Sequence, residues 1–526
     1  MFQSPLFVAI CIIAAVTPVF ALYRQFQMLQ QNSYYPSRYG RWLYDSFFND
    51  ILALTIIFCA ITILFKLGNT GVILELILIS IYAASQIFLA VRAYIKSIKK
   101  LVFTGRVIRL YAAAVIICGV LLLLTFTNKG LTKGIFFSAL AFLSVFSPAL
   151  ALLSWAVTFP IEKSVNLYFI NDAKKIIASS PNLTVIGVTG SFGKTGTKFI
   201  LARMLSERFN VVATPKSYNT PLGVVKTVRS EIRAQTEFFV CEMGAKKTGD
   251  IKEICDIVKP KLGIITAVGP QHLDTFHTIS NVFATKFELY DACKNNGGEV
   301  FVNTESEELS ARLGEKTVIP YGLSGENRAE NITYGKDGSR FTIVLGDVKI
   351  PVATKLLGRH AVINIVGAAA VAYKLGVTPE EISLAVSRLE QTEHRLELKQ
   401  SLAGSYMIDD AYNSNPEGCI EAVNVLSHFG GMKKVIITPG LVELGNQEYD
   451  FNYKLGVAAT KVCDKIILVG EKRSKPMMDA VIAENYDQNN VHVVSSFKQA
   501  LTVLASFADE NTVFLVENDL PDNYLN

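Results

Sequence analysis

A glycine-rich loop followed by a lysine and a threonine is the part of this 526-residue chain best suited to chemistry. A β-branched run at 184–189 precedes the loop and an apolar run at 199–205 follows it, which indicates a strand, a loop and a helix. Glycines let backbone N–H groups approach phosphate oxygens, and a lysine at the helix start reaches the outer phosphates. A threonine hydroxyl at that position suits Mg²⁺. The candidate nucleotide-binding residues here are Gly190, Ser191, Phe192, Gly193, Lys194 and Thr195.

The loop departs from the strict phosphate-loop pattern G-x-x-x-x-G-K-[ST]. Val188 stands six residues before Lys194, and the sequence reads G-x-x-G-x-x-G-K-T. A glycine-rich tight turn without a ligand is the competing interpretation of this pattern. The Lys-Thr pair at the helix start favours nucleotide binding.

Two predicted strands further along the chain end in residues that bind metals. Glu242 follows the apolar run at 238–241, and His272 follows the run at 262–268. Because an open α/β sheet collects its ligands at the carboxyl ends of its strands, both residues are candidates for a magnesium site near Lys194. Each has an ordinary alternative, as a strand-end acid and as a structural histidine.

The composition excludes several classes of function. The net charge is +5 with no long basic run, so no nucleic-acid partner is expected. Eight cysteines are scattered without a C-x-x-C pair, which predicts reduced thiols, no disulfide framework and no zinc site. Mean hydropathy is +0.32, and the apolar residues are concentrated at the front of the chain.

The front of the chain is predicted to be a membrane domain of about five helices. Five apolar segments have lengths close to the ~20 residues that span a bilayer as a helix. The connections at 23–49 and 92–110 are richest in arginine and lysine, which favours the cytoplasmic side for both and for everything after residue 160. The sequence thus predicts a multi-pass protein of the cell (plasma) membrane with the lipid bilayer as a partner. The predicted spans are roughly 5–22, 50–65, 71–91, 111–127 and 135–157.

The rest of the chain is predicted to be α/β. Apolar strand-like runs alternate with amphipathic segments from about residue 180 to the end, which favours parallel sheets covered by helices. The fold class expected is an α-helical membrane domain followed by a P-loop ATP-binding central domain and a Rossmann-like C-terminal domain. The expected boundaries are 1–160 for the membrane domain, 161–179 for a linker, 180–392 for the central domain and 393–526 for the C-terminal domain.

Several of these motifs together resemble the Mur ligase family, the ATP-dependent amide ligases of peptidoglycan precursor synthesis. The similarity is greatest to the MurF-like branch, which adds D-Ala-D-Ala, and it covers about residues 180–526. The phosphate loop, Glu242-Met243-Gly244-Ala245, His272-Leu273-Asp274 and Lys286 carry the resemblance. In the family, the residues matching Glu242 and His272 hold Mg²⁺, and the lysine matching Lys286 is typically carbamylated and supplies a carboxylate to a second Mg²⁺.

The resemblance therefore implies ATP and Mg²⁺ as cofactors. It implies Lys194, Lys286 and His272 as catalytic residues. It also implies a metal-ligand set of Thr195, Glu242, His272 and Lys286.

Four more residues match nucleotide-contacting positions of the family. Asn303 matches a strand-end asparagine, and Asn364 lies in the segment that matches G-x-H-N-x-x-N. Arg395 matches a phosphate-contacting arginine, and Asp409 or Asp410 matches the ribose-binding acid. The Asp pair has a helix-capping turn as its alternative interpretation.

The chain also departs from the family pattern. Ala361 stands where asparagine is common, Thr304-Glu305 replaces an acidic pair, and Glu517-Asn518-Asp519 replaces a Lys-Gly-Ser end. The family's soluble N-terminal domain, which binds the UDP portion of the acceptor, is replaced by the predicted membrane spans.

The function expected from the resemblance is a membrane-embedded, ATP-dependent amide ligase that acts through an acyl phosphate. Its partners would be an amino-acid or dipeptide amine donor and a carboxylate acceptor of the cell envelope, through D-Ala-D-Ala addition or a lipid-linked acceptor. A synthase of the poly-γ-glutamate capsule type is the nearest enzymatic alternative. The alternatives from other classes are an ATP-driven transporter and an inactive nucleotide-binding scaffold. The sequence lacks the Leu-Ser-Gly-Gly signature of transport ATPases.

Overall fold

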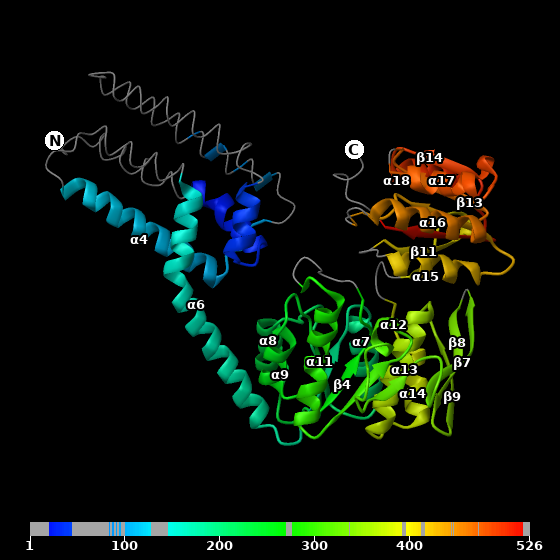
Figure 1. The fold of residues 1–526 in the computed structure, drawn as a ribbon, viewed down its shortest axis with the longest axis horizontal. Coiled ribbons are helices and arrows are strands. Elements are labelled where there is room, and N and C mark those ends of the chain that lie inside the picture. Colours follow the sequence, from blue (N-terminus) through cyan, green and yellow to red (C-terminus); the bar gives the residue numbers. More distant parts are fainter. Residues whose placement is uncertain are drawn as a thin grey trace. The chain divides into compact units, whose positions relative to one another are not determined.

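The computed structural model describes most of the chain after residue 146 and parts of what precedes it (Figure 1). The chain divides into two compact units, Met1–Tyr168 and Phe169–Asn526. The described ranges are 20–44, 100–127, 146–269, 276–335, 337–391, 396–411, 416–442, 447–471 and 473–518, with single positions at 84, 87, 88, 91, 94, 95 and 444.

The first unit contains the long helix α4 (Gly105–Thr127) and most of α6 (Ser147–Ala178). A small apolar core joins them to the segment at 20–44, with Phe26 edge-on to Tyr111 at 4.7 Å between ring centroids. The two helices are also joined by charge, because Arg109 Nε donates to Glu162 Oε1 at 2.6 Å. Glu162 is only 5% exposed, so this ion pair compensates the burial of its carboxylate.

The predicted location in the cell membrane is wrong for the part of the chain that the structure describes. None of the described helices is long and apolar enough to cross a membrane. In α6 the described residues of the predicted span at 135–157 are followed on the same helix by the charged pair Glu162 and Lys163. The lipid bilayer as a partner and a cytoplasmic side for the later domains depended on these spans. The predicted span at 50–65 lies outside the described residues, and so do residues 5–19 of the first span, most of 71–91 and residues 135–145 of the last span.

The second unit begins with a six-stranded parallel sheet in the order β2-β3-β1-β4-β5-β6. Buried β-branched and aromatic residues fill its central strands, as expected of a parallel sheet covered on both faces. Successive residues of β1 face opposite sides of the sheet. Ile186 packs with α7, α13 and α14, whereas Val185 packs with α8, α9 and α11. The two groups of helices lie on opposite sides of the sheet in Figure 1.

The strands of this sheet are β1 (Thr184–Thr189), β2 (Val211–Ala213), β3 (Phe238–Glu242), β4 (Leu262–Ile265), β5 (Glu299–Asn303) and β6 (Ile319–Tyr321). Its helices are α7 (Lys194–Leu205), α8 (Pro221–Glu231), α9 (Asp250–Val258), α11 (Ile279–Asn295), α12 (Glu307–Ser310), α13 (Arg359–Lys374) and α14 (Pro379–Ser387).

A three-stranded antiparallel sheet, β7-β8-β9, packs against α13 and α14. Its strands are β7 (Asn327–Gly335), β8 (Gly338–Leu345) and β9 (Val348–Thr354). Inward residues such as Phe341 and Ile343 extend the core of the parallel sheet, so the two sheets form one domain.

The C-terminal part forms a second six-stranded sheet in the order β10-β11-β15-β12-β13-β14, in which only β10 is antiparallel to its neighbour. Helices α15, α16 and α17 cover one face and α18 covers the other. The strands are β10 (Glu397–Gln400), β11 (Tyr406–Asp410), β12 (Lys433–Thr438), β13 (Lys465–Val469), β14 (Val491–Val494) and β15 (Thr512–Glu517). The helices are α15 (Pro416–Ser427), α16 (Glu448–Val462), α17 (Lys475–Ala483) and α18 (Phe497–Ala505), with short 3₁₀ turns η1 (Leu402–Gly404) and η3 (Gln488–Asn490).

The α/β fold expected for the central and C-terminal domains is confirmed. The domain boundaries expected at 160, 179 and 392 stay predictions. Because β1, β3, β4 and β5 run parallel, the residues that follow them meet at one edge of the first sheet.

The close approach of β1 to α11 gives a stability prediction. A Cβ added at Gly187 would lie 2.5 Å from Leu289 Cδ1 and 3.0 Å from Met243 Cε. Gly187→Val is therefore expected to destabilise the chain by about 1–3 kcal/mol or more through overpacking, measured as a fall in the urea midpoint. Gly430→Val is the matched control, because a Cβ at Gly430 meets nothing within 4 Å. Equal midpoints for the two variants would contradict this account of the packing.

Candidate functional site

The glycine-rich loop runs from the end of β1 to the start of α7 and fits tightly against its surroundings. Gly190 has φ of 154°, and a Cβ there would lie 2.1 Å from Thr266 Oγ1. Gly193 has φ of 79°, in the left-handed region, and a Cβ there would lie 3.0 Å from Asn364 Oδ1. Both positions therefore require glycine, on backbone conformation as well as on space.

The loop is also tied to the segment that follows β4. The Ser191 N–H donates to the Ala267 carbonyl at 2.7 Å, and the Ser191 hydroxyl exchanges hydrogen bonds of 3.1 Å with both backbone groups of Gly269. The Thr266 hydroxyl donates to the Phe192 carbonyl. The Ser191 side chain thus fixes the shape of the loop, and the assignment of Ser191 to the nucleotide site stays a prediction.

Lys194 folds back over the loop that it follows. Its ammonium donates to the Gly190 carbonyl at 2.7 Å and to the Ser191 carbonyl at 3.0 Å. A phosphate-loop lysine placed over its own loop carries its charge to where the outer phosphates of a nucleotide would lie.

Glu242, the last residue of β3, is buried at the same edge and accepts hydrogen bonds from several elements. Its Oε1 accepts from the Thr195 hydroxyl at 3.1 Å and from the Asn219 amide at 2.9 Å. Its Oε2 accepts from the Lys198 ammonium at 3.0 Å. The Glu242 N–H donates to Thr214 Oγ1 at 3.0 Å. The structure therefore brings Thr195 and Glu242, two of the predicted metal ligands, into contact.

Sequence reasoning missed two partners of Glu242, Lys198 and Asn219. Lys198 is fully buried and lies one helical turn after Lys194, so the i, i+4 spacing on α7 was the available signal. Asn219 lies in the segment before α8 and carried no comparable signal. Burial lowers the pKa of Lys198 from that of an exposed lysine, and the charge and hydrogen bond of Glu242 offset part of this shift.

Lys286 lies on α11 and is 1% exposed. Burial lowers its pKa to about 7, and the nearby charge of Lys194 adds to the shift. The charges of Glu288 and Asp250 act in the opposite direction. A surface lysine would show no such shift, so the structure separates Lys286 from the exposed lysines of the same domain.

The donor set fits a hard divalent cation only in part within the described residues. A carboxylate and a hydroxyl oxygen suit Mg²⁺, and Glu242 and Thr195 supply them. No group of three His, Cys, Asp or Glu side chains that could hold a metal occurs in the described part of the chain. His272 lies outside the described residues, and so does Arg395.

The predicted asparagines lie at the edge of the same sheet. The Asn303 amide donates to the Thr266 carbonyl at 2.7 Å, and its oxygen accepts from the Glu305 N–H at 2.9 Å. Asn303 therefore holds together the ends of β4 and β5. Asn364, on α13, lies against Gly193 of the phosphate loop.

In the C-terminal domain, Asp409 is buried and paired. Its Oδ2 accepts from the Lys399 ammonium at 2.9 Å, and its Oδ1 accepts from the Ala411 N–H at 3.3 Å. Lys399 also contacts Glu397 at 2.9 Å, and hydrogen bonds to both carboxylates raise the pKa of Lys399. The neighbouring Asp410 points to the other face of the strand, where it accepts from the Leu396 N–H at 3.1 Å.

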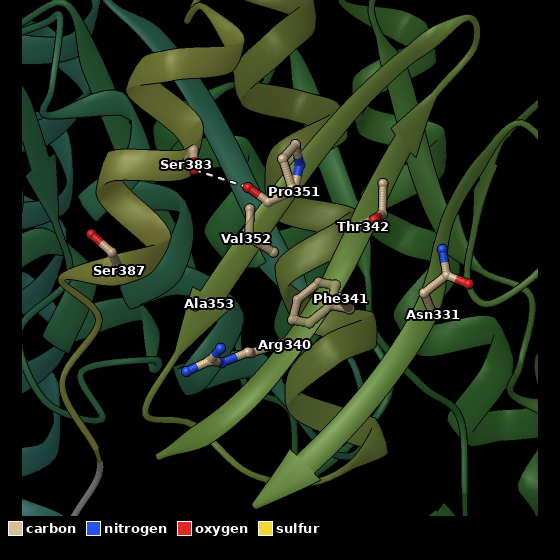
Figure 2. Close-up of a pocket in the computed structure, with 9 residues that line it drawn as sticks. All are labelled: Asn331, Arg340, Phe341, Thr342, Pro351, Val352, Ala353, Ser383 and Ser387. Carbon is tan, nitrogen blue, oxygen red and sulfur yellow. Dashed lines mark hydrogen bonds between the residues drawn. The ribbon is translucent and has the colours of Figure 1, made fainter.

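A shallow groove of about 520 Å³ lies on the antiparallel sheet, between β8, β9 and α14 (Figure 2). Ser383 donates to the Pro351 carbonyl at 3.0 Å across it. Arg340, its only charged residue, is exposed. None of the candidate site residues lines this groove, so it adds nothing to the site at the sheet edge.

Two family models match this chain. Residues 188–372 match the Mur ligase middle domain, and residues 394–517 match the Mur ligase, glutamate ligase domain. The chain is 27% identical over 339 residues to the UDP-N-acetylmuramoyl-tripeptide--D-alanyl-D-alanine ligase of Bacillus subtilis, covering 63% of this chain and 72% of that one. It is 29% identical over 305 residues to the ligase of the same name from Mycobacterium tuberculosis, covering 56% of this chain and 59% of that one.

Two solved structures share the fold. MurF from Acinetobacter baumannii superposes with a TM-score of 0.58 at 25% identity, over 67% of this chain and 78% of that one. The MurF ligase from Thermotoga maritima in complex with ADP superposes with a TM-score of 0.59 at 23% identity, over 67% of this chain and 80% of that one.

The buried lysine gives a prediction of pH dependence. Between a pKa of about 7 in the folded chain and 10.5 in the unfolded chain, the unfolded chain binds one more proton at Lys286. Stability therefore rises with pH across this range, and protonated Lys286 costs the fold several kcal/mol below it, at about 1.4 kcal/mol per pKa unit. Lys286→Met is expected to be more stable than the parent chain at pH 6, with the difference shrinking towards pH 10.

The measurement is urea unfolding at pH 6, 8 and 10 in buffers purged of carbon dioxide. Lys252→Met, at an exposed position on α9, is the matched control and should follow the parent chain at every pH. A Lys286→Met variant whose stability parallels the parent across this range would contradict the prediction.

Proposed function

We propose that this chain, which carries a Mur ligase middle domain and a Mur ligase, glutamate ligase domain, uses ATP to form an amide bond on a cell-envelope precursor. The observation that carries the proposal is the convergence of Lys194, Thr195 and Glu242 at one edge of the first sheet. This arrangement is suited to phosphoryl transfer, because a phosphate-binding loop lies beside a buried carboxylate and a hydroxyl contacts that carboxylate. The similarity to named D-Ala-D-Ala ligases supports this reaction over a transport ATPase or an inactive scaffold.

We propose ATP and Mg²⁺ as the nucleotide and the metal. The loop ends at the start of α7, where backbone N–H groups can bind phosphate oxygens, and Thr195 with Glu242 would hold Mg²⁺. Bound there, Mg²⁺ would neutralise charge on the phosphate oxygens. Lys194 would exchange its two carbonyl partners for the outer phosphates and stabilise charge on the transferred phosphoryl group.

The proposed reaction has two steps. An oxygen of the acceptor carboxylate attacks the outer phosphorus of ATP, which gives an acyl phosphate and ADP. The amine donor then attacks the acyl carbon, the C–O bond to phosphate breaks, and an amide and inorganic phosphate form as the amine loses a proton. We propose a UDP-linked muramoyl tripeptide as the acceptor and D-Ala-D-Ala as the donor, which are the substrates in the names of the relatives. The lipid-linked acceptor considered from the sequence depended on membrane helices and is not proposed.

The C-terminal domain would complete the site. Arg395 and Asp409 are proposed to reach ATP from that domain, and closure of the two domains would exclude water from the acyl phosphate. The pairing of Asp409 with Lys399 means that a ribose would have to displace an ion pair to reach it. Asn303 and Asn364 are proposed to contact the nucleotide from the sheet edge and from α13.

We propose that carbon dioxide modifies Lys286. With a pKa of about 7, a large share of its amine is uncharged at neutral pH and is a nucleophile. Attack on carbon dioxide forms an N–C bond and releases one proton to solvent, and the product is a carbamate anion. This change replaces repulsion of Lys194 by attraction and supplies an oxygen ligand where a lysine stands. His272 is proposed as a further ligand.

The ligase proposal predicts stoichiometric ADP, phosphate and amide from ATP, UDP-N-acetylmuramoyl-tripeptide and D-Ala-D-Ala in the presence of Mg²⁺. Lys194→Met is expected to lower kcat by about 10²–10³-fold, the effect of removing one charge-stabilising donor. Lys252→Met should retain the parent rate. Product is identified by mass spectrometry. ATP hydrolysis without a new amide would contradict the proposal, and incorporation of glutamate in its place would favour the capsule-type synthase.

The carbamate proposal predicts one carbamate ¹³C resonance when the chain is equilibrated with ¹³C-labelled bicarbonate at neutral pH. The resonance should be absent in Lys286→Met and present in Lys252→Met. A spectrum of the parent chain without this resonance, or one unchanged by Lys286→Met, would show that Lys286 is not modified.

A further inference from the structure

Lys198 is a buried charge that the proposed reaction does not use. Its ammonium lies 3.0 Å from Glu242 Oε2, and the side chains of the two residues are 0% and 1% exposed. It also donates to the Lys216 carbonyl. Both bonds of this ammonium are therefore made inside the protein, at the edge where the candidate site lies.

Stability alone does not account for this pair. Removing two charges from water carries a large desolvation cost, and a buried ion pair can often be replaced by apolar residues without loss of stability. The strands and helices around the pair are rich in well-packed apolar residues that would allow such a replacement. A charge kept at this position points to a role for the carboxylate that it contacts.

The contacts divide the two oxygens of Glu242 between different kinds of donor. Oε2 is bonded to a cation, and Oε1 accepts from the neutral Thr195 hydroxyl and the neutral Asn219 amide. The pair at Oε2 joins two full charges, whereas the bonds at Oε1 join the carboxylate to uncharged donors, so the electrostatic attraction at Oε2 is the stronger. An incoming cation would therefore displace the neutral donors from Oε1 more easily than it would displace Lys198 from Oε2.

We infer that Lys198 is a positioning residue that anchors Glu242 by Oε2, so that Oε1 stays directed at Thr195 and the phosphate loop to receive a divalent cation. This inference rests on the proposed function, in which Glu242 and Thr195 hold the metal. Lys198 itself touches neither the metal nor the nucleotide.

The second bond of Lys198 extends this role to the neighbouring segment. Lys216 has φ of 47°, in the left-handed region, and lies in the stretch that also contains Thr214 and Asn219. Thr214 accepts from the Glu242 N–H and Asn219 donates to Oε1. Lys198 thus holds the carboxylate and the segment that contacts it in one arrangement.

The test is metal binding rather than catalysis. Mn²⁺ replaces Mg²⁺, and free Mn²⁺ is measured by electron paramagnetic resonance with ADP present. Lys198→Met is expected to weaken Mn²⁺ binding by about 10–100-fold, as the loss of outer groups that orient metal ligands does. ADP affinity measured with a chelator should stay within about twofold, because Lys194 and the loop amides are untouched. Lys252→Met is the control for the loss of one lysine.

A double variant tests whether Lys198 acts through Glu242, and it serves if Lys198→Met does not fold. Lys198→Met/Glu242→Gln removes both buried charges and is expected to bind Mn²⁺ as Glu242→Gln alone does. A double variant that binds about tenfold more weakly than Glu242→Gln would overturn the inference. Unchanged Mn²⁺ binding in a folded Lys198→Met would overturn it as well.

The parent chain separates this inference from the proposed function. A parent chain that binds no Mn²⁺ with ADP would overturn the proposed metal site and, with it, the role of Lys198. If the parent chain binds Mn²⁺ and the Lys198→Met variant binds it equally well, the inference alone is overturned.

Discussion

A carboxylate buried at the edge of a parallel sheet is the constraint on which the candidate site depends. Glu242 is 1% exposed. An unpaired charge at such a position would cost more free energy than the net stability of a folded domain. Its partners therefore come from every element within reach, with Thr195 and Lys198 on α7 and Asn219 in the segment before α8. The fold sets this arrangement, since parallel β1 and β3 bring the loop and the carboxylate to the same edge.

Three lysines near this edge differ in their environment, and the difference assigns them different tasks. The Lys194 ammonium lies over the glycine loop and donates to a backbone carbonyl that a phosphate could replace. The Lys198 ammonium is paired with the Glu242 carboxylate. Lys286 is buried without the same compensation, so its pKa lies at about 7. In the proposed reaction one site would thus contain a cation for phosphate, a structural cation and a nucleophilic amine, because burial and partners act differently on the same side chain.

Local patterns in the sequence were sufficient for the phosphate loop, the strand that ends in Glu242 and the α/β character of both later domains. They did not reveal Lys198 or Asn219, because these residues meet Glu242 only after the strands are ordered β2-β3-β1. Nor did they show that Asp409 is paired with Lys399, which depends on the antiparallel register of β10 on β11. The membrane prediction rested on hydropathy, which does not show whether apolar side chains pack inside the protein, as those of Ala114 and Leu150 do. His272 and Arg395 lie outside the described residues, so their roles as a metal ligand and a phosphate-contacting residue stay predictions.

In the proposed reaction, this edge of the sheet activates a carboxylate by phosphoryl transfer. The most direct test of this reaction follows ¹⁸O from the labelled terminal carboxylate of UDP-N-acetylmuramoyl-tripeptide during turnover with ATP and D-Ala-D-Ala. Because the carboxylate oxygen that attacks phosphorus leaves with it, one ¹⁸O atom is expected in the inorganic phosphate for each amide formed. Amide formation with unlabelled phosphate would contradict the account.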